Sequence, residues 1–209
     1  MKAHGDSRTA FTLIELLVVI GIISAVLLFT IPAVVGISKS NNLNNAGRIV
    51  SNLLTVARSE AIARRSLIRF EVATTWPSDP AYAYRKFAIV QHDAATGTDT
   101  QLTGWETLPN GTVFQSQDPD KNQPGKYFFV LNQTQNPKLQ FANASVDTTY
   151  IEFTPTGALN INLADSPVRL RIDQGVYDAK NAQIVLTGTS NWYDASIDGL
   201  VGRIKLSRP

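Results

Sequence analysis

The most apolar part of the chain lies near its N-terminus, where the segment Leu16–Ser38 carries no charge over 23 residues. A helix rises about 1.5 Å per residue, so this segment would cover about 34 Å and cross a hydrocarbon core of roughly 30 Å. Residues 1–10 are short and polar, with Lys2 and Arg8, which is typical of a targeting leader. Because basic residues favour the cytoplasmic side, the pattern predicts one membrane pass with a cytoplasmic N-terminus and everything after Lys39 exported.

Residues 39–65 continue with a helical pattern that becomes amphipathic after an Asn-rich patch. The apolar positions recur at steps of three and four. They are Leu43, Ala46, Val50, Leu53, Leu54, Ala57, Ala61 and Ile62. We therefore expect one helix from Phe11 to Arg65, apolar on all sides over residues 11–38 and packed through one stripe over residues 39–65. Pro32 is where this helix is expected to kink.

From residue 66 the spacing of apolar positions changes to a period of two. Ile68, Phe70 and Val72 alternate with charged residues, and the same alternation returns at 151–153 and 168–172. Such alternation predicts half-buried antiparallel strands, with turn signals between them. The expected fold class is therefore α+β, a long N-terminal helix packed on an antiparallel β-sheet that is built by a β-rich head, residues 66–209.

Composition narrows the classes of function. The 19 Lys and Arg residues are set against 17 Asp and Glu, a net charge of +2, which is not the strong basic excess of a typical nucleic-acid binder. The chain has no cysteine and two histidines, so thiol chemistry and disulfides are excluded. We recognise no nucleophile with a base, no acid pair and no metal cluster, and expect neither an enzyme nor a cofactor. Asp118–Asn122 offers oxygen ligands like a calcium loop, but Gly125 follows too late for one, which favours a polar turn.

One carboxylate, Glu15, lies just inside the apolar segment, in Ala10-Phe-Thr-Leu-Ile-Glu15-Leu. An ionised acid costs about 2.5–3.5 kcal/mol at the centre of a membrane helix and less near an end, so such a residue points to a function and a partner. Cleavage before Phe11 would supply that partner as a new α-amino group, one turn away or from a neighbouring subunit. Neutralising both charges would favour one register between packed helices. The alternative, an ordinary signal or plain anchor, is disfavoured by Glu15.

Phe11-Thr-Leu-Ile-Glu15 after a short basic leader resembles the prepilin cleavage and methylation motif of type IV pilins and type II secretion pseudopilins. The resemblance covers the leader and the start of the helix. It implies cleavage between Ala10 and Phe11 by a prepilin peptidase, N-methylation of Phe11, and a role for Glu15 in subunit assembly. It also implies residence in the bacterial inner membrane until the subunit enters a filament. Ala10 departs from the usual glycine, which is expected to slow cleavage, and Pro32 falls where such helices commonly kink.

A second resemblance narrows the class. The segments Leu53–Arg65, Phe153–Gly157 and Gly202–Leu206 are similar to minor pseudopilins of the GspH class and to their FimT and FimU pilus counterparts. This implies a pilin-like fold and a low-abundance subunit near a filament tip, with other pilin or pseudopilin subunits as partners. The resemblance leaves open contact with secreted cargo, and whether the machine is a secretion pseudopilus or a type IV pilus.

Basic residues near the C-terminus support an alternative, a DNA-binding minor pilin for natural transformation. Arg169, Arg171, Arg203 and Lys205 would form one basic face if the last strands are neighbours. FimT-like pilins of competent bacteria resemble this arrangement with a Gly-Arg-x-Arg tail, in which Lys205 here replaces the second arginine and lacks its fork. The plain interpretation is a solvated strand face. A membrane-anchored binding module that never polymerises is the remaining alternative.

Overall fold

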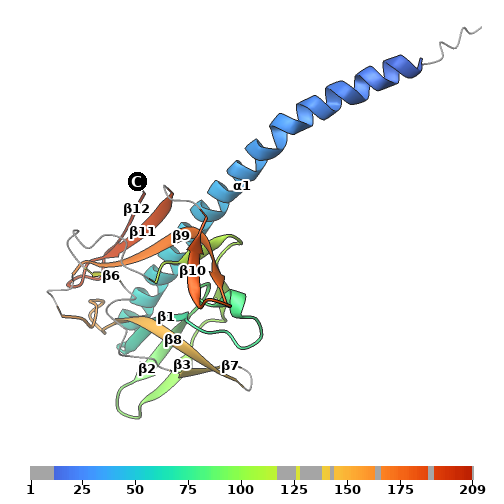
Figure 1. The fold of residues 1–209 in the computed structure, drawn as a ribbon. Helices are drawn as coiled ribbons and strands as arrows, with labels where there is room; N and C mark the ends of the chain where they lie inside the picture. The colour runs from blue at the N-terminus through green and yellow to red at the C-terminus, as the bar shows by residue number, and fades with distance from the viewer. Residues whose placement is uncertain are drawn as a thin grey trace, which may run out of the picture. The chain divides into compact units, whose positions relative to one another are not determined.

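The computed structural model describes residues 12–116, 126–127, 138–141, 144–162, 166–187 and 191–208. Contacts divide the chain into two units, Met1–Ser40 and Asn41–Pro209, and the second is called the head unit below. One helix, α1 (Leu13–Arg64), contributes residues to both units (Figure 1). The expected single helix is therefore confirmed.

In the first unit, every described side chain of α1 between Leu13 and Leu28 is exposed. Leu13 is 81% exposed and Leu28 is 72% exposed, so large apolar side chains of this segment remain open to the surroundings. Among the described residues, no helix combines the length and the apolar character that a membrane crossing requires. The membrane span expected over residues 11–38 therefore stays a prediction. Pro32 lies within the continuous helix, and the kink expected there also stays a prediction.

In the head unit, α1 is amphipathic and buries one stripe of side chains. Six of the eight expected positions are fully buried, and Leu53 is partly buried against the same core. The six are Leu43, Ala46, Val50, Leu54, Ala57 and Ala61. Ile62 is 44% exposed, because it follows Ala61 and so lies about 100° round the helix from it. The sequence spacing thus predicted the packing face of the helix well.

The strands form two six-stranded sheets rather than the one that was expected (Figure 1). The first has the order β3-β2-β1-β8-β7 with β4 on β2, and the second has the order β10-β9-β11-β12 with β5 and β6 on β9. The bounds in the first sheet are β1 Leu67–Ala73, β2 Lys86–Asp93, β3 Thr98–Gln101, β4 Glu106–Thr107, β7 Lys138–Phe141 and β8 Ala144–Phe153. Those in the second are β5 Thr112–Phe114, β6 Lys126–Tyr127, β9 Val168–Asp178, β10 Gln183–Leu186, β11 Trp192–Ile197 and β12 Ile204–Ser207. A short 3-10 helix, η1, covers Pro80–Tyr82.

Within the described residues the strand pairs are antiparallel, except that β6 runs parallel to β9. Aromatic side chains join the two sheets in a common core with the buried stripe of α1. The Phe87 and Phe114 rings lie 5.6 Å apart, and Phe70 lies 5.6 Å from Phe87 and 6.4 Å from Phe114. The expected α+β class, a helix packed on antiparallel strands, is confirmed.

The charged positions of β1 are buried, and the expectation of a half-buried strand is wrong there. Arg69 is 8% exposed and Glu71 is 0% exposed. The reason is that β1 is flanked on both edges, by β2 and by β8. Long side chains from these neighbours close over it, as the Tyr150 ring does 4.2 Å from the Arg69 guanidinium. Alternation alone does not show whether the second face of a strand is covered.

Candidate functional site

The first turn of α1 contains a capping box between Thr12 and Glu15. Glu15 Oε2 accepts hydrogen bonds from the Thr12 backbone N–H at 2.9 Å and from the Thr12 hydroxyl at 2.8 Å. In return, the Glu15 N–H donates to Thr12 Oγ1 at 3.3 Å. This reciprocal pattern satisfies backbone donors that a helix start leaves open. The Thr-x-x-Glu spacing is the sequence signal for a capping box, and the role of Thr12 in it was not predicted.

Glu15 is also the only charged residue from Phe11 to Ser38, and it stands among exposed apolar side chains. Its carboxylate contacts the backbone N–H of the residue that directly follows Phe11. Ala10 and Phe11 themselves lie outside the described residues. Cleavage, N-methylation and the assembly role of Glu15 therefore stay predictions.

The structure brings two of the four basic candidates together. Strands β9, β11 and β12 are neighbours as the DNA-binding hypothesis required, and Ser196 pairs in register with both Arg169 and Lys205. Residues paired in this way carry their side chains on one face of a sheet. Arg169 and Lys205 accordingly line one pocket of about 200 Å³, which also includes Asp194, Ser196 and Ser207.

Arg171 forms an ion pair with Asp194 instead of lining this pocket. Its Nε donates to Asp194 Oδ1 at 2.7 Å and its Nη2 donates to Asp194 Oδ2 at 2.8 Å, a bidentate ion pair in the buried part of the face. Its guanidinium also lies over the Trp192 ring, 4.6 Å from the centroid. Arg203 lines a different groove. The four residues are thus divided among three environments, and DNA binding stays a prediction.

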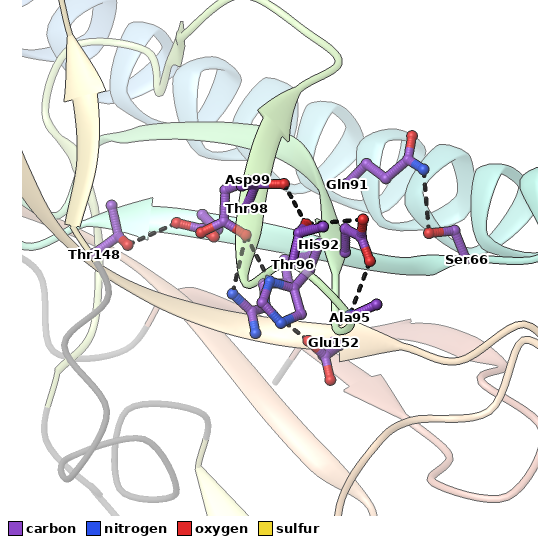
Figure 2. A network of polar contacts seen from close by, with 12 residues as sticks. Ser66, Gln91, His92, Ala95, Thr96, Thr98, Asp99, Thr148 and Glu152 are labelled. Atoms are coloured by element: carbon purple, nitrogen blue, oxygen red, sulfur yellow. Dashed lines mark hydrogen bonds and ion pairs between the residues drawn. The ribbon is translucent and has the colours of Figure 1, made fainter.

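A polar cluster on β1, β2, β3 and β8 was not anticipated from the sequence (Figure 2). Arg69 Nε donates to Glu152 Oε2 at 2.6 Å, and Arg69 Nη1 donates to Asp99 Oδ1 at 3.3 Å. His92 Nδ1 lies 2.7 Å from the same Asp99 oxygen. Asn160 Nδ2 donates to Glu152 Oε1 at 2.6 Å. These residues come from segments far apart in the sequence, so no local motif marks them.

Glu71 lies in this cluster and is fully buried. Its Oε2 accepts a hydrogen bond of 2.6 Å from the Thr148 hydroxyl, while its Oε1 has no partner in the described structure. Burial raises the pKa of Glu71 to about 7, against the opposing effect of the Thr148 hydrogen bond. The negative charge of Asp99 raises this pKa further. The protonation state of Glu71 therefore changes near neutral pH.

No group of three or more His, Asp or Glu side chains in the described ranges is placed to hold a metal ion. The oxygen-rich segment Asp118–Asn122 lies outside those ranges. Within the polar cluster, Arg69 pairs with Glu152 and Asp99, and His92 contacts Asp99, an arrangement that serves packing of the sheet.

Comparison with known families gives two matches. Residues 46–190 match the family described as Type II transport protein GspH. Residues 6–31 match the prokaryotic N-terminal methylation motif. No curated protein matches the chain.

Two solved structures are similar to the chain at low identity. The type IV minor pilin FimU of Pseudomonas aeruginosa PAO1 is 16% identical, with 83% of this chain and 96% of that chain covered and a TM-score of 0.44. The minor pseudopilin EpsH from the type 2 secretion system of Vibrio cholerae is 10% identical, with 80% and 98% covered and a TM-score of 0.42. Likeness at these levels carries no argument about function.

The family match is stronger evidence, because residues 46–190 make up more than half of the 209 residues. It includes the buried stripe of α1 from Ala46 onward, all strands of the first sheet, and β5, β6, β9 and β10 of the second. The resemblances to the prepilin motif and to the GspH class are confirmed. The chain belongs to the family of type II transport protein GspH and is a minor pseudopilin or pilin subunit.

Proposed function

We propose that this subunit is cleaved between Ala10 and Phe11, N-methylated at Phe11, and assembled through residues 11–38 into a type II secretion pseudopilus or a type IV pilus. The match to the methylation motif over residues 6–31 supports this proposal. Its partners are then a prepilin peptidase and other pilin or pseudopilin subunits. The inner membrane holds the chain before assembly, with the N-terminus in the cytoplasm and the head outside.

The observation that carries the proposal is the exposed apolar start of α1 with its lone carboxylate. Twelve large apolar side chains between Leu13 and Leu28 are more than 40% exposed. Burying one such side chain fully contributes about 1.5–3 kcal/mol. The free energy gained by burying the whole segment is therefore much larger than the cost of one ionised acid inside a membrane helix, which is about 2.5–3.5 kcal/mol. Lipid before assembly and neighbouring helices after it would both provide that burial.

The geometry of the capping box makes Glu15 suitable for registration. Because its carboxylate contacts the Thr12 N–H, cleavage would leave the α-amino group of Phe11 one residue from the atom that Glu15 already binds. In the membrane this amine would offset the charge of Glu15 within one chain. In a filament, an amine from a neighbouring subunit would do the same and would favour one axial register, because a displaced register leaves both charges unpaired. The role is structural and associative, and the peptidase is a separate protein.

The test begins with the intact mass and N-terminal residue of the chain from its native membrane. We expect a chain that starts at methylated Phe11. Two variants then separate charge from helix capping. Glu15→Gln removes the charge and keeps an acceptor oxygen for Thr12, whereas Thr12→Ala removes the hydroxyl of the cap and keeps the charge.

We expect Glu15→Gln to be cleaved but to lose at least about tenfold in sheared filaments, a difference of about 1.4 kcal/mol in assembly. Thr12→Ala is expected to enter filaments at close to the wild-type level. An uncut chain, or one cut near Ile37, would refute the processing step. Equal losses in the two variants would limit Glu15 to helix capping and refute its role in registration.

A further inference from the structure

A groove of about 420 Å³ lies in the head unit between α1 and the segment that leads into β12. Thr55 and Arg58 line it from the helix, and residues 201–204 line it from the other side. Among the described residues, the charged ones that line it are two arginines, Arg58 and Arg203, and none is an acid. The groove therefore favours a negatively charged ligand group.

Arg58 is held in a defined orientation by the backbone. Its Nε lies 3.3 Å from the carbonyl oxygen of Gly157 and 3.0 Å from that of Val201, and donates to both. Its two terminal nitrogens make no hydrogen bond or ion pair with the described part of the chain. A guanidinium fixed through Nε presents its remaining N–H groups as a planar fork, which matches a carboxylate.

Gly202 allows the wall of the groove to form. Its φ is +63°, and a Cβ at this position would lie 1.9 Å from the Gly157 carbonyl oxygen. The same Cβ would lie 3.1 Å from Arg58 Cδ. Only glycine lets the two backbones and the arginine approach this closely. Two of the segments that resemble the GspH class, 153–157 and 202–206, therefore meet at this groove.

The rim beside the arginines is apolar and held by a tight turn. Val201, which lines the groove, is 53% exposed, and Leu200, the residue before it in the chain, is 65% exposed. The turn is fixed by Asp198, whose Oδ1 accepts hydrogen bonds from the Leu200 N–H at 2.9 Å and from the Val201 N–H at 3.1 Å. Exposed apolar side chains on a fixed turn next to two cations suit a ligand that has a carboxylate with an apolar neighbour.

We propose that this groove binds an extended acidic peptide segment of a partner protein. An Asp or Glu carboxylate lies between Arg58 and Arg203, and an adjacent apolar side chain of the peptide packs on Leu200 and Val201. This contact is separate from assembly through residues 11–38 and does not depend on N-terminal processing.

Nucleic acid fits the groove less well, because a phosphate backbone offers no apolar group to the rim. The other basic candidates do not extend the positive charge along it either. Arg171 is paired with Asp194. Lys205 and Arg169 line a separate pocket. DNA-binding proteins usually neutralise several phosphates with a series of Lys and Arg residues. This groove offers two such residues, Arg58 and Arg203.

The experiment measures binding of the full chain, kept in detergent, to short synthetic peptides in which one Asp or Glu is flanked by Leu, Val or Ile. Each acidic peptide is compared with its Asn or Gln counterpart by fluorescence anisotropy. We expect acidic peptides to bind and their amide counterparts to bind at least about tenfold more weakly. Arg203→Glu is expected to weaken binding of the acidic peptides by at least about tenfold.

Arg48→Glu is the matched control, since it makes the same charge change at an exposed position of α1 that does not line the groove. It should change the affinity by less than about twofold. A peptide with Lys in place of the acid should bind Arg203→Glu better than it binds the wild type, a gain that a misfolded variant would not show.

Three outcomes would overturn the inference. The first is that no acidic peptide binds, or that acidic and amide peptides bind alike. The second is that Arg48→Glu loses as much affinity as Arg203→Glu. The third is that an oligothymidine displaces a bound peptide and itself loses affinity in Arg203→Glu, which would assign the groove to nucleic acid.

Discussion

Replacing Glu71 by glutamine is expected to stabilise the head unit at alkaline pH and to change its stability little at acidic pH. Burial raises the pKa of Glu71 from 4.5 to about 7, so the folded chain holds this proton more tightly than the unfolded chain does. The resulting stabilisation is fully present below the unfolded-state pKa of 4.5 and is lost as pH rises through about 7. At about 1.36 kcal/mol per pKa unit, the loss in the wild type amounts to about 3 kcal/mol.

Glutamine cannot ionise, but it keeps a carbonyl oxygen that can accept the Thr148 hydrogen bond. The free energy of unfolding in urea, followed by the fluorescence of the three tryptophans, Trp76, Trp105 and Trp192, should be measured from acidic to alkaline pH for the full chain in detergent. We expect Glu71→Gln to exceed the wild type by about 3 kcal/mol at alkaline pH and to lie within about 1 kcal/mol of it at acidic pH. The control is Glu106→Gln on β4, an exposed position, which should stay within about 0.5 kcal/mol throughout.

A remaining slope of the same sign is expected in the variant, because burial also raises the pKa of Asp173, to about 6. Identical pH slopes for the wild type and Glu71→Gln would refute the reasoning that burial controls this proton. Lower stability of the variant at alkaline pH would refute it in another way. That result would mean that the ionised carboxylate gains more from Arg69 than it loses through burial and through its neighbours Asp99 and Glu152.

Two further substitutions test the packing of the head by urea unfolding. Gly202→Ala should destabilise it by at least about 2 kcal/mol, since φ is +63° and the new Cβ would meet the Gly157 carbonyl oxygen. The control is Gly104→Ala, where a Cβ meets nothing within 4 Å, and it should change stability by less than about 1 kcal/mol. Arg171→Ala should cost about 3–5 kcal/mol because it leaves Asp194 buried without its bidentate partner, and a cost under about 1 kcal/mol would contradict that role.

Most of α1 and part of the strand content were predictable because their signals are local. The three- and four-residue spacing identified the buried stripe from Leu43 to Ala61, since a helix maps such spacing onto one face. Alternating apolar positions marked β1, β8 and β9. The polar strand β3 (Thr98–Gln101) carries no apolar pattern in the sequence and is recognised as a strand through its pairing with β2.

The candidate sites divide in the same way. The Thr12–Glu15 capping box and the prepilin motif each consist of residues a few positions apart, so both can be recognised from the sequence. The groove needed Arg58 to meet Gly157 and Val201, residues about a hundred or more positions away in the chain. No spacing along the sequence shows such a meeting.

By itself, the sequence of this protein determined the helix, its buried stripe, the lone carboxylate in an apolar segment and the membership of a pilin-like class, because each depends on residues within a few positions of one another. The tertiary structure alone decided that the strands form two sheets, that Glu71 on an alternating strand is fully buried, and that Arg171 pairs with Asp194 whereas Arg203 lines a groove. Burial, pKa and ion pairing depend on which distant side chains close over a residue, and that is a property of packing rather than of local pattern.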